Sequence, residues 1–535
     1  MRPVGSAVMA APGDGRPGAG AVTTREVPGG QVAAIGLPPR PGRIDGRRPA
    51  LAVVVVVFTV SRVAYALAGV RFLWQHAPFY LHFIDPDLLR HRLLQSLWYD
   101  HAQPPGLNLI WGMALKVSPA HPDRVLWPLF LGVGLATSLV LLRLLERVGL
   151  ASRWAVVVTA LWTVSPTAVT METYLLYTPL EVLGVLAVAL FVARWSEQAR
   201  TADAVGALAV ASALALTRAT FHLVWIVGLV ALLAQVRRDR WRVPAVVALL
   251  PLVVVGGWYV KNLVLFDQFG TSSWLGPNLA RVTVEQLSAK ERVRLSQGPE
   301  LSAYAPHPAF ATFEEMHLPP PADLTGGRGV PLLQRRNREG TPFPNQRYLG
   351  YLAVDRARLR DAAWVIGHRP GVYARGIRRA SSLTFGDPVD FFGYGPNVDH
   401  IEPLVAAERR ILGGWTAQPP PASPALGRWG DLGRHEWVVL AAYLVALAAV
   451  PLLLVRRRVW RRPAAGDGLV LATWGTVTYL TVLTVAADFG ENNRFRSVTD
   501  PAVLVLLAWL MVAWRTGARP QSSAVKNSNA APSAQ

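Results

Sequence analysis

The sequence predicts an all-α polytopic membrane protein with about ten transmembrane helices and a small mixed extracytoplasmic domain. Of its 535 residues, 52% are hydrophobic and 16% are charged. Apolar runs of about 17 to 25 residues recur along the chain, which is the length that an α-helix needs to cross a bilayer. Clusters of arginine stand beside these runs. A soluble globular chain does not combine these features.

The net charge of +20 is best explained by membrane topology. Arginines beside apolar runs hold helix ends on the cytoplasmic side of a membrane. No nucleic-acid-binding motif accompanies them, so we expect no nucleic acid as a partner. The chain contains no cysteine, which excludes disulfides and thiolate metal ligands.

Ten segments are predicted to cross the membrane. They lie at about residues 50–70, 125–145, 153–170, 178–195, 203–217, 219–236, 242–260, 436–455, 468–487 and 497–514. With the N-terminus in the cytoplasm, every short arginine-rich loop falls on the cytoplasmic face. The apolar stretch 106–118 is short for a crossing and would invert all later loops, so we expect a re-entrant or surface-lying helix there.

The spans divide the chain into five parts, which are predicted as follows. They are a disordered N-terminus (1–48), a transmembrane catalytic module (49–260) with its first outer loop (71–124), an extracytoplasmic domain (261–435), C-terminal transmembrane helices (436–514) and a disordered tail (515–535). The two ends lack apolar periodicity and cannot bury enough surface to offset chain entropy. The domain at 261–435 is rich in Pro and Gly, with helical patterns near 280–296 and 347–380. The protein is thus expected in the cell membrane, with both termini cytoplasmic.

The first outer loop is the densest group of titratable side chains, in the run FIDPDLLRHRLLQSLWYDHAQPPGLN at 83–108. A partly desolvated carboxylate of Asp85 or Asp87 could act as a general base or hold a divalent cation. The alternative is structural, because Asp85 before Pro86 is typical of a helix N-cap and Asp87 would favour the helix dipole. The two interpretations are compatible, since a cap fixes the direction of a carboxylate.

Two further polar residues of this loop, His101 and Gln103, precede a Pro-Pro pair that ends the helix. They are candidate substrate ligands, and the alternative is an ordinary polar helix end. Within the first span, Arg62 is a strongly basic group in the apolar layer, where charge is costly and often functional. Its partner cannot be named from the sequence.

The last outer loop, DFGENNRFRSVTDP at 488–501, carries Arg494 and Arg496 against the positive-inside tendency. Arginine binds phosphate through a planar fork of donors, so this pair could hold the head of an anionic lipid, with Glu491 and Asn493 beside it. The alternative is an internal salt bridge to Glu491. Arg218, in a tight turn between two spans, is a further phosphate candidate.

These motifs resemble those of the GT-C superfamily of polyprenyl-phosphate-sugar glycosyltransferases in their order along the chain and in their common location on the predicted outer face of the membrane. The likeness is to enzymes of the protein mannosyltransferase and lipid A aminoarabinose transferase type. The residues that carry the resemblance are Asp85, Asp87, the run 101–106, the motif at 491–496 and the segment KNLVLFDQFGTSSWLGPNL from Lys261. The first loop reads Asp-Pro-Asp where the family commonly has Asp-Glu, which leaves open whether Asp85 or Asp87 is the base. Residues 300–435 match nothing in this pattern.

The resemblance implies transfer of a sugar from a polyprenyl monophosphate carrier to an extracytoplasmic glycan, lipid or protein hydroxyl, with inversion. Asp85, which we favour over Asp87, would deprotonate the acceptor. The residues implied in substrate binding are His101, Gln103, Arg218, Glu491, Asn493, Arg494 and Arg496. We expect no cofactor, although two carboxylates in one loop are also consistent with a divalent-cation site.

The rival hypotheses are a lipid or glycan transporter or flippase, and a non-catalytic membrane scaffold. A transporter is expected to have polar or broken helices around a site at the membrane midplane. Apart from Arg62, the charged residues of this chain cluster at helix ends and on one face, which favours chemistry at the membrane surface.

Overall fold

The computed structural model describes residues 47–317, 329–413, 436–457, 459 and 466–517. In this part of the chain every regular element is a helix, and two isolated β-bridges join Leu73 to Tyr174 and Asn337 to Pro344. The described residues fall within one compact unit, Arg40–Gln535. The all-α prediction is thereby confirmed, whereas the predictions for the two terminal tails lie almost wholly outside the described residues.

Six helical segments of the described chain are long and apolar enough to cross a membrane. They are α1 (Arg47–Leu67), α4 (Asp123–Arg147), α7 (Thr178–Gln198), the continuous run Arg242–Phe266, α21 (Trp437–Arg456) and α22 (Asp467–Ala487). The run Arg242–Phe266 comprises α10 (Arg242–Val247), α11 (Leu249–Pro251), a π-helical turn (Leu252–Gly256) and α12 (Gly257–Phe266). These helices are those of a multi-pass membrane protein.

The remaining predicted crossings are shorter or broken in the structure. Helices α8 (Thr201–Thr217) and α9 (Leu223–Val236) have 17 and 14 residues. At 1.5 Å per residue α9 is about 21 Å long, less than the roughly 30 Å of a bilayer core. Helix α24 (Asp500–Gly517) is not among the six either. By length and composition, the described residues therefore support six spans, or seven with one bent pair, in place of ten.

The bent pair consists of α5 (Ser152–Val164) and α6 (Pro166–Glu172), which meet at 58°. Proline disfavours a helical residue before it and lacks an N–H, so the helix ends at Ser165, whose hydroxyl caps α6. This bend brings Glu172 to Arg62, whose guanidinium donates two hydrogen bonds of 2.9 and 2.7 Å to its carboxylate. The intramembrane arginine therefore has an internal, charge-compensating partner.

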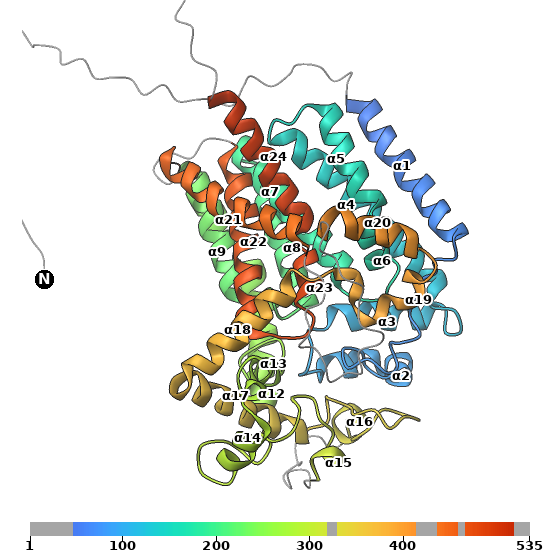
Figure 1. Cartoon of the computed structure of the whole chain (residues 1–535), viewed down its shortest axis with the longest axis vertical. Helices are drawn as coiled ribbons and strands as arrows, with labels where there is room; N and C mark the ends of the chain where they lie inside the picture. Colours follow the sequence, from blue (N-terminus) through green and yellow to red (C-terminus); the bar gives the residue numbers. More distant parts are fainter. Residues whose placement is uncertain (1–46, 318–328, 414–435, 458, 460–465, 518–535) are drawn as a thin grey trace, which may run out of the picture. The chain divides into compact units, whose positions relative to one another are not determined.

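The arginine-rich ends of several membrane helices gather at one end of the helix array, at the top of Figure 1. The end of α4 contacts the end of α7 through Arg147 and Glu197, 2.6 Å apart. Arg194 pairs with Asp203 at the start of α8 at 2.8 Å, and Arg240 donates to the carbonyl oxygen of Ala199. This grouping is what the predicted topology requires of these loops.

The helices of this array pack through small residues and branched apolar side chains. Buried residues from most helices of the array form one core, for example Leu141, Leu186, Leu208, Val477 and Leu506, which are fully buried. Helices α7 and α8 approach closely at Gly184, where an added Cβ would collide with the side chain of Leu214. Small residues at helix contacts are the usual means of association in lipid, where apolar burial alone gives no driving force.

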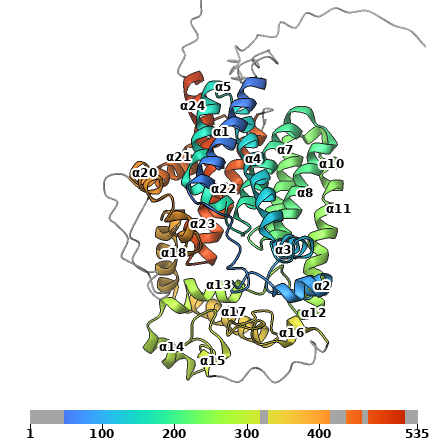
Figure 2. The same ribbon diagram turned by 90° about the vertical axis from the view of Figure 1, so that its right-hand side faces the viewer.

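Shorter helices cover the opposite end of the array, which we call the cavity end (Figures 1 and 2). They are α2 (Pro86–Trp98), α3 (Gly106–Val117), α13 (Leu275–Val282), α14 (Ala289–Ser296), α15 (Phe313–Met316), α16 (Pro331–Gln334), α17 (Gly350–His368), α18 (Pro370–Thr384), α19 (Gly395–Val398) and α23 (Asn492–Ser497). Helix α20 (Glu402–Gly413) lies beside the array, against α6 and α21. Three of them, α14, α17 and α18, coincide with the helical patterns expected near 280–296 and 347–380. The only β-structure described in 261–435 is the bridge between Asn337 and Pro344, so the expected mixed character is not observed there.

Helix α3 agrees with the prediction that 106–118 does not cross the membrane. It has 12 residues and lies across the end of the array (Figure 1). One side, with Trp111 and Leu115, is buried, while Leu109, Met113 and Val117 are exposed. An exposed apolar face on a short helix at the end of a helix array is suited to the membrane interface.

The cysteine-free chain allows a direct test of this arrangement. Asp239→Cys at the arginine-rich end and Gln297→Cys after α14 introduce single thiols at exposed positions on opposite ends. In intact cells, a membrane-impermeant maleimide is expected to label Gln297→Cys and to reach Asp239→Cys only after permeabilisation. The unmodified chain is the control, and labelling of both thiols from the same side would contradict the topology.

Candidate functional site

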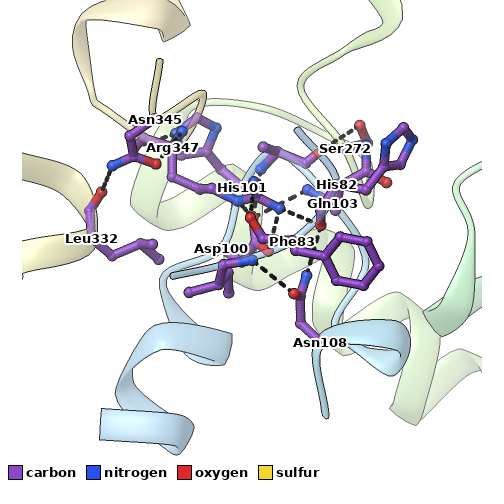
Figure 3. A network of polar contacts seen from close by, with 12 residues as sticks. His82, Phe83, Asp100, His101, Gln103, Asn108, Ser272, Leu332, Asn345 and Arg347 are labelled. Atoms are coloured by element: carbon purple, nitrogen blue, oxygen red, sulfur yellow. Dashed lines mark hydrogen bonds and ion pairs between the residues drawn. The ribbon is translucent and has the colours of Figure 1, made fainter. Parts of the chain in front are cut away.

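A buried ion pair organises the first outer loop at the cavity end. Asp100 follows α2 and is fully buried, and its carboxylate lies 3.3 Å from the guanidinium of Arg347. The same carboxylate accepts hydrogen bonds from the backbone N–H groups of Ala102 and Gln103, at 3.0 and 3.1 Å. Asp100 therefore shapes the His-Ala-Gln turn that precedes the two prolines (Figure 3).

Arg347 also holds the other side of this loop. Its guanidinium donates to the carbonyl oxygens of His82 and Phe83, at 2.8 and 3.1 Å, and to that of Leu81. Figure 3 shows these groups converging around the arginine. Residues 81–83 are thus fixed against the segment that leads into α17.

His101 connects the same network to the start of the next outer segment. Its ring nitrogens lie 3.2 Å from the Ser273 hydroxyl and 3.0 Å from the carbonyl oxygen of Arg347. Burial lowers the pKa of His101 to about 3, despite its hydrogen bond to that carbonyl, so the ring is neutral. The neighbouring Ala102 carbonyl accepts from Ser272 at 2.6 Å, while Gln103 is 9% exposed and uses its backbone N–H in the turn.

Asp85 occupies the predicted N-cap position of α2, with Pro86 at the first helical position. The side chain makes no capping hydrogen bond to the helix, however, so the structural alternative is met in position but not in bonding. Its carboxylate instead accepts from the backbone N–H of Glu339 at 3.4 Å and lies near Arg338. Burial raises the pKa of Asp85, and Arg338 and the Glu339 N–H only partly offset this, which suits a proton acceptor.

The second candidate base, Asp87, lies apart from this network. Its side chain is 46% exposed in the first turn of α2, and its partner is His91, 3.5 Å away and also exposed. The structure therefore separates the two carboxylates by environment, with one buried beside an arginine and the other in the solvated face of a helix.

The late motif forms α23, in which Arg494 is fully buried. The guanidinium of Arg494 donates to the Thr178 hydroxyl at 2.9 Å, to the Tyr177 hydroxyl at 3.1 Å and to the carboxylate of Glu491. Burial alone would raise the pKa of Glu491, but Arg494, His82 and a 2.7 Å hydrogen bond from Tyr80 bring it down to about 2. The salt bridge weighed as the alternative for this motif is thus present.

The other two candidate binding residues of the motif, Arg496 and Asn493, have different partners. Arg496 pairs with Glu436 at 2.6 Å and with Asp500 at 3.3 Å, and it is 4% exposed. Asn493 donates to the carbonyl oxygen of Asp387 at 2.7 Å. In this conformation both side chains join α23 to its neighbours, and they do not meet the residues of the first loop.

Arg218 differs from Arg494 and Arg496 because it lines a cavity of about 600 Å³. It is held by Glu181 at 2.9 Å, and its guanidinium carbon lies over the rings of Tyr177 and Phe495, at 4.7 and 3.9 Å. Arg494 donates to the hydroxyl of the same tyrosine, and Phe495 of α23 lines the cavity, so the cavity borders the buried motif. The wall is built from the turn between α8 and α9, residues 267–278, α17 and the end of α22.

Several residues of the cavity wall were not among the site residues predicted from the sequence. Asp355 of α17 and Trp274 both line the cavity and are each 4% exposed. Gly276 allows α13 to lie directly on α17, because an added Cβ there would collide with the carbonyl oxygen of Asp355. One signal was present: Asp355 lies four positions after Tyr351 and three before Arg358, which places a carboxylate on a buried helix face.

The described residues contain no group of three or more His, Asp or Glu side chains placed to hold a metal ion. Comparisons with protein-family models, curated proteins and solved structures give no match for the chain. The fold and the site together define a multi-pass membrane protein with a cavity walled by charged and aromatic side chains at the cavity end of its helix array.

The buried pair of Asp100 and Arg347 should contribute strongly to the stability of the folded protein. Asp100→Asn leaves Arg347 buried without a full countercharge, so we expect a loss of about 3 to 5 kcal/mol in stability, as for other broken buried pairs. Thermal unfolding of the detergent-solubilised protein measures this. Asp239→Asn, in an exposed pair, is the matched control and should unfold at the wild-type temperature. Equal stability of the two variants would contradict the assigned role of Asp100.

The stability of the protein should depend on the protonation of Asp355. Burial raises the pKa of Asp355 to about 7, although Ser273 and Arg358 oppose the shift. The folded state then holds a proton that the unfolded state releases near pH 4, so this contribution to stability is lost as pH rises from about 4 to about 7. As pH rises over that range, the free energy of unfolding of Asp355→Asn should therefore increase relative to that of the wild type, by about 1.4 kcal/mol for each pKa unit. Unfolding measured at pH 5 and pH 8 tests this, and parallel pH profiles would contradict it.

Proposed function

We propose that the protein is a membrane glycosyltransferase that moves a sugar from a polyprenyl-phosphate carrier to an acceptor hydroxyl with inversion. The observation that carries the proposal is Arg218, a preorganised cation in the wall of a 600 Å³ cavity at the cavity end. A volume of this size suits a sugar and its phosphate. The reaction class itself comes from the motif resemblance.

In this proposal Arg218 receives the phosphate. Glu181 and the rings of Tyr177 and Phe495 hold its guanidinium in place, so little reorganisation is needed when a ligand arrives. The carrier phosphate gains negative charge as the sugar leaves, and a fixed cation nearby stabilises that charge.

The lipid chain would approach the cavity from the bilayer. Three apolar side chains of the cavity lining are strongly exposed, namely Val224 (67%), Phe269 (62%) and Leu275 (50%). Exposed apolar residues beside a polar cavity are suited to a ligand with a phosphate head and a hydrocarbon tail. The donor would therefore enter laterally, past these exposed side chains.

The general base of the proposed reaction is Asp85. It would take the proton of the acceptor hydroxyl as the oxygen bonds to the anomeric carbon and the bond to the phosphate oxygen breaks. Asp85 does not line the cavity, and the turn at Arg338 and Glu339 covers its carboxylate. The proposal therefore requires this turn to move aside when the acceptor binds.

Two observations favour an enzyme over a transporter. Arg62, the intramembrane charge on which a transport pathway could depend, is neutralised by Glu172. The cavity lies at one end of the helix array, not halfway along it, because its lining includes the turn between α8 and α9 and residues 267–278. In the proposed topology that end is extracytoplasmic, and the acceptor is an extracytoplasmic glycan, lipid or protein.

The test is transfer of labelled sugar from polyprenyl-phosphate donors in membranes that carry matched amounts of each variant. Asp85→Asn should lower the rate at least 100-fold, because general-base contributions are typically 10²- to 10⁴-fold. Arg218→Lys should lower kcat/KM about tenfold or more, since lysine lacks the planar fork. Asp87→Asn should have a much smaller effect than Asp85→Asn.

The matched controls are Asp399→Asn and Arg375→Ala, both at exposed positions of the cavity end. They should keep the wild-type rate. Activity that survives both Asp85→Asn and Arg218→Lys would remove the proposed site, and the absence of transfer from any polyprenyl-phosphate donor would count against the reaction class.

A further inference from the structure

Two buried polar atoms in the wall of the cavity lack a hydrogen-bond partner. They are Oδ2 of Asp355 and Nε1 of Trp274, and neither is satisfied by any group in the described part of the chain. Both residues line the cavity, and both are 4% exposed. Nearly all buried polar atoms in native proteins have a partner, so one acceptor and one donor left over in the same cavity point to a bound ligand.

The surrounding packing holds both side chains in place. Ser273 donates to the other side of the Asp355 carboxylate, and Gly276 lets the Trp274 segment lie against the backbone of α17. The Trp274 ring packs edge-on against Phe310 and His82, with centroids 5.1 and 5.2 Å away. The unsatisfied donor and acceptor are therefore preorganised.

We propose that Asp355 and Trp274 form the subsite for the sugar ring of the lipid-linked donor, and that this ring is a neutral, hydroxyl-bearing sugar. Above about pH 7, where Asp355 is ionised, a ring hydroxyl can donate to its Oδ2 while a ring oxygen accepts from Nε1 of Trp274. Arg218 lines the same cavity and would hold the phosphate next to the ring. This inference rests on the proposed function and names the part of the site that recognises the sugar.

The charges of the wall favour a neutral sugar over an amino sugar. The lining carboxylates of the described chain each face an arginine: Asp267 lies 3.5 Å from Arg356 and Asp488 lies 3.4 Å from Arg281. Asp355 is compensated by the charge of Arg358. An ammonium group would therefore find no uncompensated negative charge in this wall, whereas a hydroxyl needs only the two free hydrogen-bonding atoms.

The experiment measures equilibrium binding of three lipids to the full-length protein in nanodiscs without acceptor. The lipids are polyprenyl phosphate, its mannose or arabinose phosphodiester, and its aminoarabinose phosphodiester. Trp274→Phe removes the donor and keeps an aromatic ring, while Asp355→Asn replaces the free acceptor with an isosteric amide. Trp364→Phe, on the same helix as Asp355, and Asp399→Asn are the matched controls.

Trp274→Phe and Asp355→Asn should each weaken binding of the neutral-sugar lipid about tenfold and leave that of polyprenyl phosphate unchanged. Arg218→Lys should weaken both, and the controls neither. Equal weakening of both lipids by Trp274→Phe and Asp355→Asn, or no weakening, would overturn the subsite while leaving the proposed function intact. Preference of the wild type for the aminoarabinose lipid would overturn the neutral-sugar assignment. Failure of the wild type to bind any polyprenyl phosphate would remove the proposed function itself.

Discussion

The cavity end of this protein depends on the ion pair between Asp100 and Arg347. Neither side chain is more than 1% exposed, so each charge is tolerable only because the other neutralises it. Arg347 uses its remaining donors on the backbone of residues 81–83, and Asp100 uses its carboxylate on the turn after α2. Through His101 the same network reaches Ser273. Three stretches far apart in the sequence thus meet around one pair of charges.

The same constraint decides which cations a ligand can reach. A buried arginine without a countercharge is strongly unfavourable, so Arg494 lies against Glu491 and Arg496 against Glu436. Arg218 has its own partner but also borders the cavity. Charge compensation therefore makes both arginines of α23 part of the internal structure, whereas Arg218, in the turn after α8, lies in the cavity wall.

Much of the helical framework could be predicted from local patterns, whereas the differences depend on helix length and on residues distant in the sequence. The run in α1 and the Asp85-Pro86 helix start are readable because spacing and proline chemistry act within a few residues. The count of ten crossings is not confirmed in the described residues, because helices such as α8 and α9 are apolar but short. The side chain of Asp85 makes no capping bond and instead accepts from the N–H of Glu339, 254 positions away, a contact that no local pattern reveals.

The sequence by itself determined that the chain is a helical membrane protein and which polar residues collect at helix ends, because apolar length and charge placement are properties of contiguous residues. Only the tertiary structure decided which charges pair, as with Asp100 and Arg347, which are 247 positions apart. It also decided that Arg218, Asp355 and Trp274 share one cavity. Such pairings depend on how helices pack, and packing depends on side chains from the whole chain at once, so no local pattern encodes them.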